Sequence, residues 1–546
     1  MLPGEDPAAR RVLMVCLAAG VTTLLDQSVL NIAMPALRQS LSAGAADVQW
    51  IVSGYSLAFG LTLVPGGSLG DVRGRKGLFL LGLSVFVLCS VAAATAQHAA
   101  VVVAARLVQG AGAGLVNSQV IGTLQDIFQG LARARALGLY AVTAGVASAL
   151  GPALGGVLVG VSPAGLGWRL RLLLSTPFGV ATLWLATRRL PPARRVAAQA
   201  RLDLGGLACV AALTLSLMLP FIRPPGSHKE AALWAAAALA SAGLLVVGQR
   251  RRGHTGGTAV VRPTERHTQK DRAPVERRTG RPDRDKQAPT RAQAGPRDRD
   301  EQASTQQQAS VRRAPLVHPA LVRSGAYALG TGVAMAQFGA TMAAGLVLAL
   351  FLQSGLGLPA PAAAAVTLPA AVGMMVASAV AWRVMRRLGT HTVTLGVGLG
   401  ILALVAEALA AVSLPRASLP YVLAGMQLCT GAASGLTVSP NQARVLQHAP
   451  AEAAGVAGGI LQMAQRVAAA VCLSAVSGIY LRGVAATTDT PRTAFAQACL
   501  VCAGVLTAAL VLCLIRSRET PHVQTVQPPD SSGRPGSLDH SSREPS

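Results

Sequence analysis

Long runs of apolar residues recur along the whole chain and are separated by short polar connections. About 20 apolar residues are enough for a helix to cross a bilayer core of roughly 30 Å, and we count about fourteen runs of that length. A chain that crosses a bilayer must satisfy its backbone hydrogen bonds internally, which a helix does within one segment. The pattern therefore predicts an all-α integral membrane protein with about fourteen transmembrane helices.

The order of the runs predicts two related halves. The first six spans are expected at about 12–36, 48–69, 78–97, 99–122, 136–161 and 170–188. Two more, at about 205–222 and 231–248, form a hairpin around a short turn. The last six are expected at about 325–353, 361–382, 391–413, 419–440, 456–480 and 494–515. Two six-helix bundles are what a rocking transporter requires, since one bundle moves against the other around a central site.

The runs divide the chain into five parts. We expect an N-terminal six-helix bundle over 1–200, an extra hairpin over 201–248 and a C-terminal six-helix bundle over 321–516. The segment 249–320 carries mixed charges, Pro and Gln with almost no large apolar residues, and the tail over 517–546 is also polar. Neither segment can bury a core, so we expect both to be disordered and cytoplasmic.

The charge pattern gives the orientation. A formal charge of +25 would suggest nucleic-acid binding in a soluble protein. Here 51% of the residues are hydrophobic, and basic residues gather in alternate short connections, at Arg73, Arg75, Lys76, Arg133, Arg135, Arg188, Arg189, Arg194, Arg195, Arg383, Arg386 and Arg387. This positive-inside bias predicts a multi-pass protein of a bacterial plasma membrane with both termini cytoplasmic, and no nucleic-acid partner.

The connection between the second and third spans reads GSLGDVRGRK and ends at Lys76. Gly74 permits a tight reversal, and Arg75 with Lys76 holds the loop at the cytoplasmic face. Asp71 is placed to accept hydrogen bonds from a neighbouring helix N-terminus. We predict that these four residues gate the conformational change. A weaker echo, WRVMRRLG at 382–389, stands at the corresponding place in the second half.

Several motifs carry a family resemblance. The loop pattern G-x-L-x-D-x-x-G-R-K resembles the signature of the major facilitator superfamily, and Arg106, Gln109 and Gly110 are similar to its R-x-x-Q-G motif. The segment LDQSVLNIAMP at 25–35 resembles the fourteen-helix drug:proton antiporters of that superfamily. The fifth span resembles the superfamily's antiporter motif, with packing residues Gly151, Pro152, Gly155 and Gly156.

The resemblance implies the fold and the function. It implies a major facilitator fold with two six-helix bundles plus the extra hairpin. It also implies a proton-coupled efflux antiporter that exports a small, largely apolar organic compound, such as an antibiotic or toxic metabolite, and confers resistance. Such a protein would act as a monomer on its substrate and protons, driven by the proton gradient without a cofactor. The alternative is a proton-coupled importer or facilitator of a small nutrient, which the fifth-span motif counts against.

Two ionisable residues are expected deep in the membrane. Asp26 lies roughly 21 Å along the first span from Val12, or about 9 Å below the outer boundary of the core. Arg106, on a span running inward from Ala99, lies roughly 10 Å below the same boundary. Ionisable residues at bilayer depth are costly and tend to be functional. We predict that Asp26 and Arg106 form the proton-coupling pair.

Further polar residues in the spans are candidates for the wall of a central cavity: Asn31, Ser53, Tyr55, Gln109, Gln337, Glu407, Gln462 and Arg466. Glu407 lies in the outer part of its span, from which its side chain could reach water. Gln462 and Arg466 are one turn apart, and they either line the cavity or pair with another helix.

A membrane-embedded enzyme is the alternative from another class. Such enzymes commonly need acidic clusters or His-acid constellations at one membrane face. The sequence has no DDxxD-like cluster, no HExxH and no Walker sequence, so we expect no catalytic or metal site and no ATP-driven transport. The spacing of Cys499 and Cys502 lies within an apolar span without further ligands, so we interpret this pair as packing.

Overall fold

The computed structural model describes residues 7–128, 166–191, 204–224, 226–256, 323–389, 391–449, 454–485 and 491–519, with single residues in 132–158 and Leu321. This part of the chain is helical and contains no strand. Thirteen of its segments are long and apolar enough to span a membrane. The remaining predicted span, 136–161, falls largely outside the described residues. The prediction of an all-α multi-pass membrane protein is confirmed.

The described helices follow the predicted order of two bundles separated by a hairpin. In the first bundle they are α1 (Pro7–Ser40), α2 (Ala45–Gln49), the π-helical η1 (Trp50–Gly54), α3 (Tyr55–Arg73), α4 (Arg75–Thr95), α5 (Ala99–Ile127), α7 (Gly167–Leu173) and α8 (Ser175–Arg189). The hairpin consists of α9 (Leu204–Ile222) and α10 (His228–Gly256). In the second bundle they are α13 (Gly325–Leu350), the π-helical η2 (Phe351–Gly355), α14 (Ala360–Leu388), α15 (His391–Ser413), α16 (Leu419–Gln447), α17 (Ala454–Ala485) and α18 (Pro491–Glu519).

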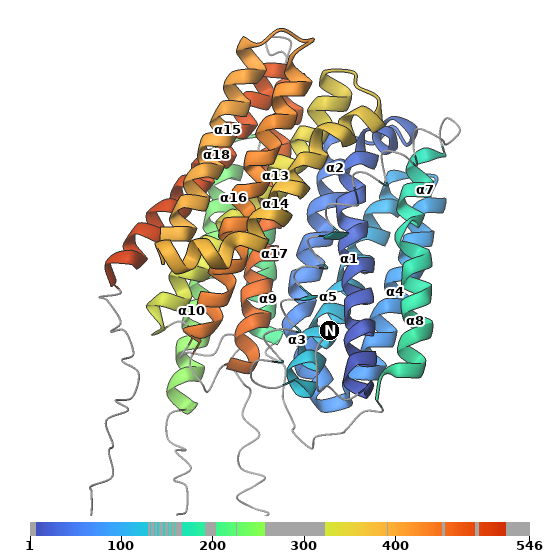
Figure 1. The fold of residues 1–546 in the computed structure, drawn as a ribbon, viewed down its shortest axis with the longest axis vertical. Helices are drawn as coiled ribbons and strands as arrows, with labels where there is room; N and C mark the ends of the chain where they lie inside the picture. The colour runs from blue at the N-terminus through green and yellow to red at the C-terminus, as the bar shows by residue number, and fades with distance from the viewer. Residues whose placement is uncertain are drawn as a thin grey trace, which may run out of the picture.

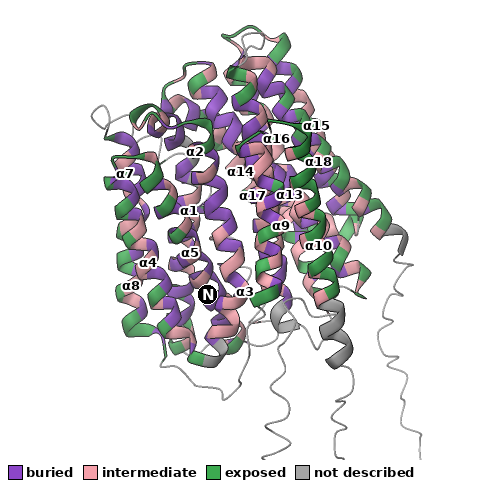
Figure 2. Cartoon of the chain, turned by 180° about the vertical axis from the view of Figure 1, so that it is seen from behind, coloured by how far each residue is buried: buried purple, intermediate pink, exposed green. Residues whose placement is uncertain are grey.

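The two bundles stand side by side with their long helices running in roughly the same direction (Figure 1). Contacts between them are made chiefly by α17 with α3, and by α1 with α13. The hairpin joins this seam, because α9 packs against both α17 and α3. Its second helix, α10, carries many exposed apolar residues along its outer surface, as expected for a helix that faces lipid (Figure 2).

Corresponding turns lie at one end of both bundles. Gly74 ends α3 with φ of 92°, and Gly389 ends α14 with φ of 54°, a region that glycine enters at little cost. Arg73 and the pair Arg386 and Arg387 lie in the last turns before these glycines. Both loops of the sequence echo therefore turn at a glycine with positive φ. We call this the basic end and the other end the far end.

Small residues bring one pair of helices very close in each bundle. A Cβ at Gly110 would meet the backbone oxygen of Tyr55, and one at Gly114 would meet that of Phe59, so α5 lies directly on α3. In the second bundle, a Cβ at Gly431 of α16 would meet the backbone oxygen of Ala370 in α14. Small residues four apart permit such approach between membrane helices. Gly110 and Gly114 therefore form the face of α5 on which α3 lies.

The two bundles are joined more completely at the far end. There one buried apolar cluster includes Leu37 and Val48 of the first bundle with Leu350 and Phe351 of the second. Toward the basic end, the described apolar residues form separate clusters in the two bundles. Val64 is the first-bundle side chain that packs against the second-bundle cluster there. The largest cluster shared by the two bundles thus lies at the far end, and α3 also packs on α17 nearer the middle, where Phe59 and Leu63 meet Met463.

Gly431→Ala is expected to destabilise the protein, because the new methyl group collides with the backbone of α14 and the helices must separate. Overpacking of this kind costs about 1–3 kcal/mol or more. Gly425→Ala, on the same helix, is the matched control, since its new methyl group meets open space, and it should be neutral or slightly stabilising. Thermal unfolding of the two purified variants tests this, and equal stability would show that the α14–α16 contact is not tight.

Candidate functional site

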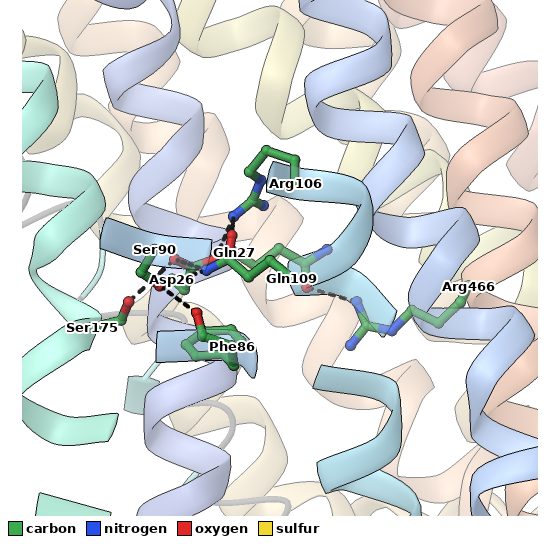
Figure 3. Close-up of polar contacts among 8 residues, drawn as sticks. All are labelled: Asp26, Gln27, Phe86, Ser90, Arg106, Gln109, Ser175 and Arg466. Carbon is green, nitrogen blue, oxygen red and sulfur yellow. Dashed lines mark hydrogen bonds and ion pairs between the residues drawn. The ribbon is translucent and has the colours of Figure 1, made fainter. Parts of the chain in front are cut away.

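Two buried ionisable residues meet inside the first bundle. Asp26 on α1 and Arg106 on α5 are 4% and 1% exposed, and Arg106 Nη1 donates to Asp26 Oδ2 over 2.6 Å (Figure 3). An unpaired charge at this depth is costly, so pairing explains how both residues are tolerated. The structure brings the two predicted residues into direct contact. Their role in proton coupling stays a prediction.

Neutral donors complete the environment of the carboxylate. Gln109 Nε2 and Ser175 Oγ each donate to Asp26 Oδ1 over 3.2 Å. Gln109 also accepts from Arg106 Nη1 at 2.7 Å and donates to Ser90 Oγ at 2.7 Å. Asp26 is therefore held by residues from three other helices, α5, α8 and, through Gln109, α4. Gln109, expected in the cavity wall, instead belongs to this network and lines neither of the two interior cavities.

Tyr55 covers the opposite side of the ion pair. The Arg106 guanidinium carbon lies 4.2 Å from the centroid of the Tyr55 ring, within the range of a cation–π contact. Arg106 Nε and the Tyr55 hydroxyl have no hydrogen-bond partner among the described residues. Ser53, also expected in the wall, is buried with an unpartnered hydroxyl and lines neither cavity.

Two small cavities of about 10 Å³ each lie in the interior. The first is lined by residues of both bundles: Gln27, Leu30, Val52, Tyr55, Arg106, Met342 and Leu473. The second lies within the second bundle and is lined by Ala334, Gln337, Phe338, Thr437, Val438, Asn441, Gln442 and Gln465. Each has space for roughly one water molecule. Tyr55 and Gln337 are the predicted wall residues that line a cavity, and the Asn31 side chain lies outside the described residues.

Arg466 reaches from the second bundle to the first. It is 6% exposed, and its Nη1 donates to Gln27 Oε1 over 2.6 Å (Figure 3). Its guanidinium lies 4.1 Å from the Phe59 ring centroid and 5.0 Å from that of Phe338. Of the two alternatives left by the sequence, pairing with another helix is therefore observed. Gln462 is half-buried and lines neither cavity.

Glu407 corrects an expectation. Its side chain does not reach water, since the residue is 1% exposed on α15. Glu407 Oε1 accepts from Gln427 Nε2 at 2.9 Å and from Thr430 Oγ1 at 3.1 Å, both on α16. It lines neither cavity, so the structure does not bring it to the candidate site. Two neutral donors on the adjacent helix satisfy the carboxyl group and so permit its burial. The position of Glu407 in the sequence did not indicate these donors.

The predicted gating loop is anchored to other helices at the basic end. Arg75 Nε lies 2.7 Å from Asp126 Oδ2 at the end of α5. Lys76 Nζ donates to the backbone oxygens of Thr187 and Leu190 at 2.9 Å each. Gly74 forms the turn between α3 and α4. The loop therefore ties three helices together, while the Asp71 side chain lies outside the described residues.

The antiporter motif of the fifth span is described in part. Gly151 is helical and buried, whereas Pro152, Gly155 and Gly156 lie outside the described residues. Among the described residues, no group of three or more His, Cys, Asp or Glu side chains is arranged to hold a metal ion.

Sequence reasoning missed several residues that the structure brings to the site. Gln27, Ser90 and Ser175 complete the polar contacts, and Phe59 and Phe338 enclose Arg466. Gln27 directly follows Asp26, and this position is the sequence feature from which its place near the site could have been predicted. Serines in membrane helices commonly donate a hydrogen bond to the backbone of their own helix. The contacts of Ser90 and Ser175 with the site could therefore be assigned only once the neighbouring helices were placed.

The fold and site define a multi-pass α-helical membrane protein with an ion pair in its interior. The Major Facilitator Superfamily model matches residues 16–473. The chain therefore belongs to the Major Facilitator Superfamily.

Solved structures show the same fold. An auto-inhibited peptide transporter of the POT family matches 95% of this chain and 99% of its own, with a TM-score of 0.59 and 15% identity. The xylose transporter XylE from E. coli matches 94% of this chain and 100% of its own, with a TM-score of 0.54 and 12% identity. At such low identity these structures support the fold alone.

Curated relatives are more similar in sequence over shorter stretches. The probable actinorhodin transporter of Streptomyces coelicolor is 33% identical over 47% of this chain and 45% of its own length. The cephamycin export protein of Amycolatopsis lactamdurans is 37% identical over 39% of this chain and 43% of its own length. The tetracenomycin C resistance and export protein of Streptomyces glaucescens is 32% identical over 42% and 43%. The chain thus spans less than half the length of these relatives.

Glu407→Gln is expected to leave folding and transport close to normal, because the amide oxygen can still accept from Gln427 and Thr430. Glu407→Ala leaves the buried Gln427 amide without this acceptor, which costs about 1–3 kcal/mol, whereas the Thr430 hydroxyl can still donate to Met426 O. Thermal unfolding and transport by both variants check this. If Glu407→Gln abolishes transport in a stable protein, the charge of Glu407 takes part in the cycle.

Proposed function

We propose that this chain is a proton-coupled efflux antiporter that exports a small, largely apolar organic compound, such as an antibiotic or a toxic metabolite, and confers resistance. The observation that carries the proposal is the buried contact between Asp26 and Arg106. The relatives named for antibiotic export or resistance support the direction of transport and the class of substrate.

Asp26 is the proposed proton carrier because its buried carboxyl group lies in direct contact with a buried arginine. Arg106, Gln109 and Ser175 all donate to it. Protonation would remove the charge that pairs with Arg106 and leave a lone guanidinium in the interior. A change of one proton therefore alters the relative energies of two arrangements of the helices, as coupling requires.

The basic end is the proposed cytoplasmic end, with both termini on that side of a bacterial plasma membrane. Arginines at the ends of α3, α8 and α14 support this orientation through the positive-inside bias. The closed cluster at the far end then faces outward. The chain would act as a monomer, driven by the proton gradient without a cofactor.

Asp26→Asn and Arg106→Ala are expected to reduce proton-driven transport to the background level of membranes without the protein. The first variant removes the proton site, and the second removes the group that holds the ionised carboxylate. The measurement is uptake into everted vesicles with an acidic interior, using any compound that the wild-type chain exports in a resistance panel.

Asp47→Asn is the matched control, since Asp47 is partly exposed and caps the turn before α2 with a bond to Gly44 N of 2.9 Å. It should transport normally. Undiminished uptake by stable Asp26→Asn protein would exclude Asp26 as the proton carrier. Uptake driven by an alkaline interior rather than an acidic one would indicate proton-coupled import instead of efflux.

The orientation predicts where reporter proteins are active. The segment 257–320 follows α10 at the basic end, the proposed cytoplasmic side. A reporter inserted there should be active only if it is of a kind that works in the cytoplasm. A reporter inserted after Ser413, between α15 and α16, should be active only if it is of a kind that works on the outer side of the membrane. Alkaline phosphatase and green fluorescent protein fusions at both places provide the test, and the reverse pattern would contradict the orientation.

A further inference from the structure

The described interior holds more positive than negative charge. The buried Asp, Glu, Lys and Arg residues are Asp26, Glu407, Arg106, Arg171 and Arg466. Asp26 pairs with Arg106, while Glu407 contacts neutral donors. Arg171 and Arg466 therefore have no carboxylate partner among the described residues. Unpaired charge at membrane depth is costly and is retained where it has a function.

Arg466 differs from Arg171 in its position. Arg171 lies on α7, which packs against α1 and α4 within the first bundle. Neither Arg171 nor Arg466 itself lines a cavity. Arg466 lies on α17, which forms much of the seam between the bundles. Its partner Gln27 lines the first cavity, and Phe338, which it contacts, lines the second. The guanidinium thus stands between the two cavities.

The contacts of Arg466 leave binding capacity unused. Guanidinium carries five N–H donors, and its side-chain hydrogen bond in the described part of the chain goes to one neutral oxygen, that of Gln27. Phe59 and Phe338 lie within 4.1 and 5.0 Å of it and hold it between apolar rings. A charge in such surroundings attracts an anion more strongly than the same charge in water.

We propose that the exported compound is an organic anion and that Arg466 binds its acidic group. The proposal rests on the proposed efflux function and names the substrate class of that site. A carboxylate forms charge-assisted bonds that are roughly twice as strong as a bond from a neutral amide oxygen, so it can displace Gln27. The aromatic side chains of Phe59 and Phe338 would contact the apolar body of the compound.

Displacement of Gln27 links binding to movement. The Arg466–Gln27 bond joins α17 of the second bundle to α1 of the first. When an anion takes the place of Gln27, one bond between the bundles is lost, and the far end can open more easily. Gln27 also directly follows Asp26, so binding at Arg466 and protonation at Asp26 act on the same turn of α1.

A purely structural role is the alternative, in which Arg466 only clamps the two bundles together. The two roles differ in substrate choice. A clamp would affect transport of every compound equally, whereas an anion-binding residue discriminates between an acid and its neutral ester. The test therefore compares matched compounds as well as matched variants.

The first experiment identifies the compounds that the wild-type chain exports. A drug-sensitive bacterium expressing it is challenged with three carboxylic acids, fusidic acid, nalidixic acid and mupirocin, and with three cations, ethidium, crystal violet and benzalkonium. Tolerance should rise for one or more of the acids and for none of the cations. Export of cations alone would overturn the inference while leaving efflux intact. Export of none would count against both the efflux function and the inference.

The second experiment uses an exported acid and its methyl ester in everted vesicles. Wild-type protein should transport the acid and not the ester. Arg466→Gln should weaken the apparent affinity for the acid by about 10- to 100-fold, the loss expected for a hydrogen bond to a charged group. Arg466→Lys should retain part of the affinity because it keeps the charge. Arg482→Gln, an exposed arginine on the same helix, is the matched control and should behave as wild type.

Size-exclusion profiles and thermal unfolding show whether each variant is folded. Arg466→Lys keeps the test decisive if Arg466→Gln is unstable. If Arg466 binds the anion, the lysine variant should still prefer the acid over its ester, whereas a clamp predicts no preference between the two compounds. Equal transport of acid and ester by the wild-type protein, or unchanged affinity in folded Arg466→Gln, would overturn the proposal.

Discussion

The pairing of Asp26 with Arg106 is the constraint on which the interior of the first bundle depends. Either charge alone would be costly at this depth, and their pairing holds α1 against α5. The lack of a side chain at Gly110 lets α3 approach α5 closely, and Tyr55 on α3 then covers the guanidinium at 4.2 Å. The glycine motif and the ion pair are therefore one structural unit. Serines from α4 and α8 complete its hydrogen bonding.

The second bundle repeats the architecture without repeating the charges. Gly431 brings α16 against α14 as Gly110 brings α5 against α3, and Gly389 turns the chain where Gly74 does. No buried ion pair occurs among its described residues. Its arginine at the seam, Arg466, contacts the first bundle through Gln27 instead. The related halves thus provide a common frame, and the differences between them put the two proposed sites, for proton exchange and for substrate binding, on opposite sides of the seam.

Much of this architecture could be predicted from the sequence, because span length and charge bias are local properties. The helices and the equal depth of Asp26 and Arg106 follow from residue counting. Contacts between distant segments do not. Glu407 was expected to reach water, and its donors Gln427 and Thr430 could be assigned only once α15 and α16 were in contact. Gln27 and Phe338 acquire a role only through the meeting of the two bundles.

The central claim is that Asp26 takes up and releases the transported proton. Infrared difference spectroscopy of the purified protein in lipid nanodiscs tests it directly, by following the carbonyl stretch of a protonated carboxyl group as the pH is lowered. Exposed carboxyl groups also protonate and contribute to every spectrum. The account therefore predicts a component of the band that grows on acidification in the wild-type and Glu407→Gln proteins and is missing when the Asp26→Asn spectrum is compared with that of the wild type. The same component in Asp26→Asn would contradict it, because another carboxyl group would then carry the proton.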